Sequence, residues 1–323
     1  MNIGARTWTE RRTDLAGRLT PTVRVYLVLL ALVLVSAALS PAFLRPANLA
    51  NLLRQAVPLG IVAIGQTIVI LIGGIDVSVG SLMTLTSVLA GSLMQNSNAK
   101  ILPVVAIAMG AGLLVGLING VFVTRLKTDP FVTTLGSMLA LQGVAFLYTG
   151  GSPRNFLTPQ YRQISEGVVA GIPVPVMILA LLAVVATFVL HRTVAGRRLY
   201  SLGSNPRAAY LSGHPVNWVQ IAGYVACSLL AVTAGLILVA RTGVGDNWVG
   251  RGMELDSIAA VLIGGTAFGG GRGTVMGTIA GVLILSILFN IVNLLALSTY
   301  FQLIVKGVAI VVGVMLYSRR STA

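Results

Sequence analysis

The chain has 323 residues, of which 56% are hydrophobic and 9% charged, and its mean hydropathy is +0.92. A soluble protein of this length has no core large enough for so much apolar side chain, so the composition excludes a soluble fold and predicts an all-α integral membrane protein. The net charge of +14 does not indicate nucleic-acid binding, because the basic residues are spread through the loops without a clustered, aromatic-lined face. We expect these residues to lie against anionic lipid headgroups of the bilayer.

About ten apolar segments are candidate membrane-spanning helices, on the rule that a span needs about 20 mostly apolar residues. The second and the eighth are short and end in glycines, so the sequence leaves open whether they cross the membrane fully or re-enter it. The segments are residues 23–40, 57–73, 78–96, 101–123, 131–149, 173–191, 218–240, 256–270, 274–296 and 299–317.

The distribution of basic residues predicts the orientation of these spans. Residues 1–22 are polar and rich in arginine, so we expect a cytoplasmic basic tail followed by a single membrane domain over residues 23–320. Ten spans place both termini in the cytoplasm and give a positive-inside bias of roughly two to one. Besides the tail and Arg24, the cytoplasmic side receives Arg125, Lys127, Arg192, Arg197, Arg198, Arg207, Arg272, Arg319 and Arg320, and the opposite side receives Arg45, Arg54, Lys100, Arg154, Arg162, Arg241 and Arg251.

The chain lacks the residues with which a transporter converts energy by itself. None of its three lysines follows a glycine, so the G-x-x-x-x-G-K-[ST] loop of an ATPase is excluded. Ion-coupled carriers bury several carboxylates or histidines, whereas Asp76 is the one acid set between two apolar segments here. The single cysteine, Cys227, allows no disulfide within the chain, and no Cys/His spacing indicates a metal site. We therefore expect neither a cofactor nor a metal, and no catalytic residues can be named.

A first glycine-rich break, Gly73–Gly80, interrupts the apolar sequence with G-G-I-D-V-S-V-G. Non-helical backbone at membrane depth is tolerated where it is buried in protein or lines a wet cavity. Asp76 is expected there either as the cap of the next helix or as a direct contact to a sugar hydroxyl, capping being the commoner role. Polar residues in apolar spans either line a translocation path or act as hydrogen-bonding glue between helices. The path candidates are Gly73, Gly74, Asp76, Ser78, Gln66, Asn119, Gln142, Asn290 and Asn293.

A second glycine-rich break, Ile263–Gly273, reads I-G-G-T-A-F-G-G-G-R-G. Like the first break it follows one apolar run and precedes another, which hints at an internal repeat of the kind found in transporters. Arg272 is expected to stabilise a helix end or to contact a partner. Close packing of helices through small residues is the alternative explanation.

The longest cytoplasmic loop, residues 192–217, contains a predicted two-turn helix. Asn205 is a good N-cap, Pro206 suits the first helical position, and Gly213 followed by Pro215 ends the helix. So short a helix is stable only when it docks on something. The element expected to couple to a cytoplasmic motor comprises Asn205, Pro206, Arg207, Ala208, Ala209, Tyr210, Leu211, Ser212 and Gly213, and packing on the chain's own spans is the alternative.

These stretches resemble the permease subunits of ATP-binding-cassette (ABC) importers of the ribose/monosaccharide type. The resemblance rests on the first break, on D-P-F-V-T-T-L-G-S-M from Asp129, and on T-G-G-S-P from Thr149. It extends through G-R-R-L-Y-S-L-G-S-N, A-A-Y-L-S-G, E-L-D-S-I-A-A-V-L-I-G-G-T from Glu254, and Q-L-I-V-K-G up to Gly307. It covers nearly all of the chain beyond residue 40, in order and spacing.

The resemblance implies a non-catalytic permease subunit of the bacterial cytoplasmic (inner) membrane. Two permease subunits, identical or different, would form one path for a monosaccharide or related small polyol. Two cytoplasmic ATP-binding domains would dock on the short helix, and an extracytoplasmic sugar-binding protein would deliver the substrate. Pro206 and Arg207 stand where that family often carries acidic residues, so the charge of the docking face is altered.

Two other classes of function are alternatives to this one. The first is an ion-coupled secondary sugar transporter that uses Asp76, and the second is an integral-membrane enzyme, for which no nucleophile and base can be assembled. The loops 150–170 and 241–256, which carry mixed charges, are expected to form the extracytoplasmic face that meets the binding protein.

Overall fold

The structure is a computed structural model that describes residues 21–155, 157–298, 300–304 and 307–308. Its helices are α2 (Pro21–Leu39), α3 (Pro46–Leu71), α4 (Val79–Leu93), α5 (Ile101–Arg125), α6 (Pro130–Thr149), α7 (Pro159–Glu166), α8 (Val174–Arg192), α9 (Val194–Ser204), α10 (Pro206–Leu211), α11 (Val216–Thr242), α12 (Met253–Ile263) and α13 (Val275–Leu294), with a 3₁₀ turn at Asn98–Lys100. Strands β1 (Val168–Val169) and β2 (Ile172–Pro173) form a small antiparallel hairpin. The chain is thus all-helical apart from this hairpin in the residues described.

Seven helices of the described part are long and apolar enough to cross a membrane: α2, α3, α5, α6, α8, α11 and α13. Helix α4 is apolar but has 15 residues, and α12 has 11. For the eighth expected segment, 256–270, the sequence left a full span and a re-entrant one open, and the structure favours the shorter form. The chain leaves helical geometry after Ile263 in a glycine-rich run that includes positive φ angles. The tenth expected span, 299–317, lies mostly outside the described residues, and the count of ten stays a prediction.

Helix α3 begins earlier than the sequence suggests, at Pro46 rather than at residue 57. The first turns of α3 contain polar residues, so a search for apolar runs does not include them in the span. One of them, Asn48, exchanges two side-chain hydrogen bonds with Asn290 of α13, at 3.1 and 2.9 Å. Pro58 lies inside α3 and is buried. The second expected span is thus one continuous helix of 26 residues.

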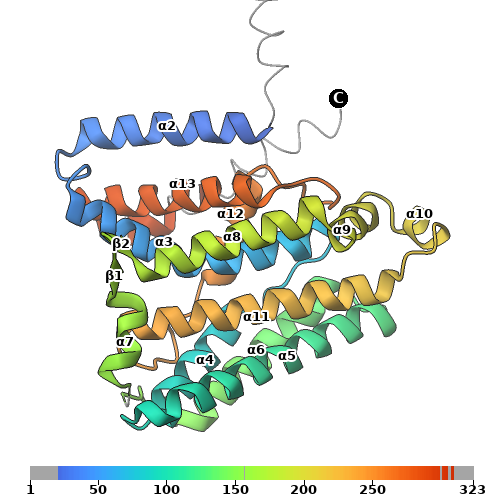
Figure 1. Cartoon of the computed structure of the whole chain (residues 1–323), viewed down its shortest axis with the longest axis horizontal. Coiled ribbons are helices and arrows are strands. Elements are labelled where there is room, and N and C mark those ends of the chain that lie inside the picture. The colour runs from blue at the N-terminus through green and yellow to red at the C-terminus, as the bar shows by residue number, and fades with distance from the viewer. Residues whose placement is uncertain (1–20, 156, 299, 305–306, 309–323) are drawn as a thin grey trace, which may run out of the picture.

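The core of the bundle is built around α3 and α11, which lie between outer helices (Figure 1). Both are mostly buried, as is α13, whereas few residues of α2, α6 and α8 are fully buried. Helix α5 packs closely on α11 through glycines spaced four residues apart. A Cβ atom on Gly116 would lie 2.6 Å from the Cα atom of Val225, so only small residues allow this approach.

The loops gather at two opposite ends of the bundle (Figure 1). One end, here called the α7 end, carries α7 and the β hairpin. The other, the α10 end, carries α9, α10 and the starts of α2 and α13, and there the hydroxyl oxygens of Thr22 and Thr274 lie 3.5 Å apart. Arg125 and Arg192 are in the last turns of helices that end there, whereas Arg241 ends a helix at the α7 end. The predicted positive-inside orientation places these two groups of arginines on opposite sides of the membrane.

Candidate functional site

Helix α10 projects from its end of the bundle and is capped by its own sequence. The Asn205 side chain accepts a hydrogen bond of 3.0 Å from the backbone N–H of Ala208, and Pro206 occupies the first helical position. At the other end, Gly213 has a φ angle of +77°. The N–H groups of Gly213 and His214 return to the carbonyls of Tyr210 and Ala209, which is a Schellman ending. The predicted helix and both of its caps are confirmed.

The surface of α10 presents apolar side chains to solvent. Tyr210 is 71% exposed and Leu211 is 76% exposed, while Ala209 is the buried residue of the helix. Six residues cannot hold a helix in water without support, and here α10 packs on α9 and on the start of α11 through one face. The opposite face is left uncovered within the described chain, as its position at the rim of the molecule shows (Figure 1).

Helix α9, which the sequence analysis did not predict, connects α10 to the membrane breaks. The contact is made by Gly203, where a Cβ atom would overlap the carbonyl oxygen of Leu71 at the end of α3. The same Leu71 carbonyl accepts a hydrogen bond of 2.9 Å from the N–H of Gly271. The end of α3, helix α9 and the second break therefore meet backbone to backbone, at a place we call the glycine junction (Leu71, Gly203, Gly270 and Gly271).

The second break holds this position through turns that require glycine. Gly270 and Gly271 have φ angles of +86° and +70°, a region that side chains disfavour. The N–H of Ala267 donates to the carbonyl of Arg272 at 2.7 Å, which closes the loop on itself. From α9, the Tyr200 hydroxyl donates to the carbonyl of Gly273 at 2.8 Å. The two glycine-rich breaks, recognised separately in the sequence, are thus neighbours in space.

Asp76 of the first break is fully buried and forms a turn just before α4, whose N-cap residue is Ser78, so the expected role of Asp76 as the helix cap is wrong. One of its carboxylate oxygens accepts hydrogen bonds from the backbone N–H of Ser78, at 2.9 Å, and from the Ser78 hydroxyl, at 2.5 Å. These bonds hold the turn that starts α4. Its other oxygen, Oδ2, has no hydrogen-bond partner in the described structure.

A buried chain of hydrogen bonds ties this break to the helices beside it. The Asn119 side chain of α5 donates to the Ser78 hydroxyl at 3.1 Å and accepts from Ser137 of α6 at 2.5 Å. The N–H of Val77 donates to the Thr134 hydroxyl of α6 at 3.1 Å. Ser78 and Asn119 have no exposed surface. Both therefore contact other parts of the same chain in this conformation.

The remaining path candidates are spread over the bundle. Gln66 is fully buried and accepts a weak hydrogen bond from the Cys227 thiol at 3.8 Å. Gln142 is half-buried on α6, and Asn290 is buried in its pair with Asn48. Asn293 is exposed and accepts from Gln302 at 2.7 Å. Gly73 and Gly74 lie beside the glycine junction, so the structure brings the break residues and Asn119 together but leaves the other amides apart.

A segment that sequence reasoning placed at the surface enters the bundle instead. Residues 243–252, here called the descending segment, start beside the outer end of α4, where Gly245 and Arg154 exchange two backbone hydrogen bonds of 2.7 and 2.8 Å. The segment then runs along α4 until the N–H of Gly250 donates to the Thr84 hydroxyl at 3.2 Å. Seven helical residues separate Thr84 from Gly91, the neighbour of Gly245, which corresponds to a descent of about 10 Å.

Exposed polar and aromatic groups line the descending segment. Trp248 is 50% exposed, packs edge-to-face on Phe146 of α6 with ring centroids 5.1 Å apart, and lies under the Arg251 guanidinium at 5.0 Å. Arg251 is itself exposed. Irregular backbone with an exposed charge is not stable against lipid tails, so this face requires water or a second protein surface. The expected charged loop 241–256 is thus partly inside the bundle, and its depth could not be read from the sequence.

Residues 48–314 match the family model described as a branched-chain amino acid transport system / permease component. This match spans α3 to α13 and includes both breaks, α10 and the descending segment. The chain belongs to this permease family. No solved structure matches it.

The permease is also similar to curated bacterial proteins over nearly its whole length. It is 41% identical to the ribose import permease protein RbsC of Bacillus subtilis, over 92% of each chain. It is 42% identical to RbsC of Escherichia coli, over 91% of this chain and 92% of the relative. It is 33% identical to the galactose/methyl galactoside import permease protein MglC of E. coli, over 91% of this chain and 93% of the relative.

These relatives confirm the resemblance that the sequence motifs indicated. The chain is an ABC-type permease, a non-catalytic multi-pass protein of the bacterial inner membrane, and any ATP hydrolysis belongs to separate subunits. The family description names amino acids while the similar permeases are named for sugars. Membership of the family alone therefore leaves the substrate class open.

Proposed function

We propose that this permease forms the translocation path for ribose, or a closely related monosaccharide, in an ATP-driven importer. The observation that carries the proposal is the identity of 41–42% with ribose import permeases along nearly the whole chain, against 33% with the galactoside permease. A residue-by-residue likeness of this extent includes the segments that would contact substrate and partners. The finer parts of the proposal rest on the geometry of α10, the glycine junction and the descending segment.

Helix α10 is the docking element for a cytoplasmic ATPase in this proposal. Tyr210 and Leu211 offer exposed apolar anchors on a helix whose ends are fixed by caps. Movement of α10 reaches α9 directly, and α9 abuts the end of α3 and the second break at the glycine junction. Backbone contacts compress little, so a shift imposed on α10 displaces both breaks together.

The path itself borders the descending segment and α6. In the descending segment, the exposed Trp248 side chain offers a flat apolar face of the kind on which sugar rings stack, and the Arg251 guanidinium can donate hydrogen bonds to hydroxyl groups. A second permease copy, facing this surface, would enclose the path. A sugar-loaded binding protein would dock at the α7 end. In this arrangement Asp76, Ser78 and Asn119 support the path by fixing the start of α4.

Reconstitution tests the function. The permease is co-expressed with candidate ATPase and binding proteins, purified into lipid nanodiscs, and assayed for ATP turnover with empty, ribose-loaded and galactose-loaded binding protein. We expect turnover to require the permease and to rise most with ribose. Stimulation by galactose alone would overturn the substrate but keep the importer.

Two substitutions and a control test the docking role of α10. Tyr210→Asp with Leu211→Asp should abolish stimulated turnover, because charges replace the apolar anchors. Leu126→Asp changes a side chain that is 61% exposed at the same end of the bundle, and it should leave turnover unchanged. Sugar uptake driven by a proton gradient, without any ATPase, would refute the importer and favour the ion-coupled carrier with Asp76.

A further inference from the structure

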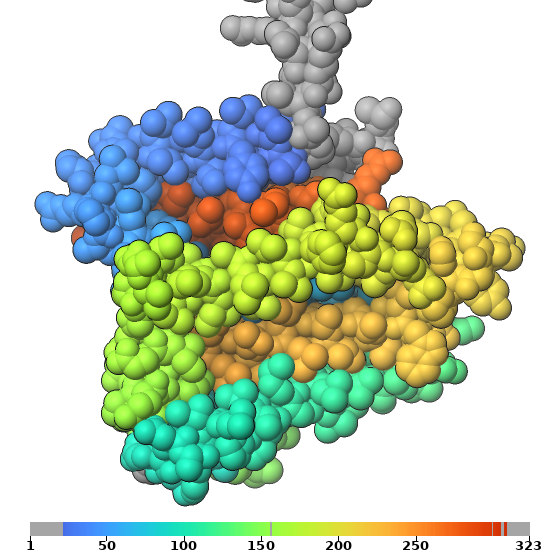
Figure 2. Space-filling view, viewed as in Figure 1, coloured from blue at the N-terminus to red at the C-terminus, as the bar shows by residue number. Residues whose placement is uncertain are grey.

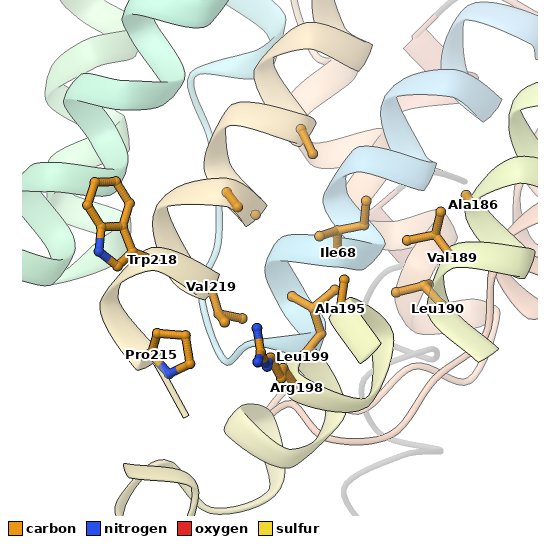
Figure 3. Close-up of a pocket in the computed structure, with 13 residues that line it drawn as sticks. Ile68, Ala186, Val189, Leu190, Ala195, Arg198, Leu199, Pro215, Trp218 and Val219 are labelled. Carbon is orange, nitrogen blue, oxygen red and sulfur yellow. The ribbon is translucent and has the colours of Figure 1, made fainter. Parts of the chain in front are cut away.

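A groove between α8, α9 and α11 opens on a face of the bundle that none of the preceding functions uses. It encloses about 370 Å³ and has part of α3 as its floor (Figure 3). The space-filling view shows the hollow between the yellow-green α8 and the orange α11 (Figure 2). Its thirteen lining residues are apolar or aromatic apart from one, Arg198.

The groove runs from the end of the bundle that carries α10 toward the middle of the spans. Pro215 and Trp218 line it at the start of α11, and Ala226 lines it three turns further along. Eleven residues of helix correspond to about 16 Å, roughly half of the hydrocarbon thickness of a bilayer. Trp218 is 64% exposed at the mouth, which is the level where tryptophan side chains meet lipid headgroups.

The lining of the groove matches a ligand that has one apolar and one anionic part. The walls beyond Arg198 are aliphatic, so at membrane depth they are covered by hydrocarbon rather than by water. The Arg198 side chain points among Val219 and Leu199 (Figure 3), and its Nε atom is buried without a hydrogen-bond partner in the described structure. No lining residue is acidic. The guanidinium in this position is free to donate to an anion, and its planar donors match the oxygens of a phosphate.

Neighbouring residues strengthen the positive charge at the mouth of the groove. Arg192 ends α8 and Arg197 precedes Arg198 on α9, and both are exposed. The outer face of α8 continues with the exposed side chains of Leu181, Val184 and Phe188, which is a surface suited to lipid tails. The positive-inside distribution assigns this end to the cytoplasm, where the leaflet is rich in anionic lipid.

We propose that the groove binds one anionic phospholipid of the cytoplasmic leaflet. An acyl chain lies along α11 over the α3 floor, and the phosphate accepts hydrogen bonds from Arg198 beside Trp218. The lipid lies next to α9, the helix that carries Gly203. This binding site is independent of which sugar the permease carries.

Fluorescence of Trp218 measures the occupant directly. The chain has three tryptophans, so Trp8→Phe with Trp248→Phe leaves Trp218 as the only one. The full-length permease is placed in mixed micelles with phospholipid whose acyl chain carries bromine, a contact quencher. We expect phosphatidylglycerol to quench at about five-fold lower mole fraction than phosphatidylcholine, the factor expected for one arginine near an anionic headgroup.

Three variants separate the proposal from general lipid contact. Arg198→Gln should remove the preference for phosphatidylglycerol, and Arg197→Gln, a change of equal charge on an exposed neighbour, should keep it. Ala222→Phe fills the groove without changing charge and should weaken quenching by both lipids. Elution as a single species in gel filtration checks that each variant is folded. Equal quenching by the two lipids, or a preference that survives Arg198→Gln, would overturn the proposal. Absence of quenching by either lipid would do so as well and would indicate a protein surface over the groove.

Discussion

Gly203 of α9 lies directly against the carbonyl oxygen of Leu71, the last residue of α3, with no room for a Cβ atom between them. The same oxygen accepts the hydrogen bond from Gly271. The carbonyl oxygen at the end of α3 is therefore in contact with two segments far away in the sequence, α9 and the second break. Since α9 packs on α10, this atom links the proposed ATPase contact to both glycine-rich breaks.

Gly203→Ala should uncouple ATP turnover from sugar. The added methyl group overlaps the Leu71 carbonyl and would lie 2.5 Å from the Gly271 nitrogen, so α9 must move away from the breaks. Overpacking of this kind costs about 1–3 kcal/mol, and we expect the stimulation by loaded binding protein to fall at least about ten-fold. Gly110→Ala is the control, because a Cβ atom there meets nothing within 4 Å. Full stimulation in Gly203→Ala would contradict the role of the junction.

Asn205→Ala should weaken coupling through the loss of one cap. The substitution removes the hydrogen bond to Ala208 and costs about 1 kcal/mol of helix stability, a large share for a helix of six residues. We expect a lower apparent affinity of the permease for the ATPase, measured by titration of ATPase against nanodisc-bound permease. Asn205→Asp, which also caps, should restore the affinity. Equal affinity in all three proteins would show that docking does not depend on the α10 start.

Asp76→Asn should retain most of the transport, and Asp76→Ala should not. An asparagine oxygen accepts the two hydrogen bonds from Ser78, whereas alanine removes both bonds from the turn before α4, at a cost of about 0.5–1.5 kcal/mol for each. Ribose-stimulated ATP turnover and thermal unfolding of each variant are the measurements. An ion-coupled carrier requires an ionisable group, so inactivity of Asp76→Asn in a normally stable protein would favour that mechanism.

Cysteine labelling tests whether the descending segment faces water. The only native cysteine, Cys227, is buried, so Cys227→Ala gives a background without reactive thiols. In that background, Arg251→Cys should react with a membrane-impermeant maleimide in intact vesicles. Leu181→Cys, at a position 62% exposed in the middle of α8, should stay unlabelled because it faces lipid. Protection of Arg251→Cys in the lone permease would indicate that this face is closed.

The parts of the structure that the sequence predicts are those decided by neighbouring residues. Asn205, Pro206 and Gly213 define α10 because caps act within one helical turn. Asp76 was expected mainly as a cap for the same reason, and its carboxylate does act locally, but on Ser78 in the turn before α4 and not on the N–H groups of the helix. Apolar runs located most of the spans because a bilayer sets their length.

The parts that the sequence does not predict depend on distant residues. Nothing near Gly203 indicates that Leu71 lies against it, since the contact joins segments more than a hundred residues apart. Charges in residues 243–252 suggested a surface loop, yet packing on α4 draws this segment inward. The start of α3 was missed because its first turns carry polar residues, and the pairing of Asn48 with Asn290 on another helix is not revealed by a count of apolar residues.

Pro58 gives α3 a preferred site of bending. Proline has no N–H, so the carbonyl of Arg54, four residues earlier, lacks its helical partner, and the ladder of hydrogen bonds has a gap in the outer half of the helix. A displacement of Leu71, at the other end of α3, can therefore change the angle between the helix segments before and after Pro58 without distorting either segment. In the proposed coupling, the half of α3 that ends at Leu71 would turn about Pro58, while the half held by the Asn48–Asn290 pair would stay in place.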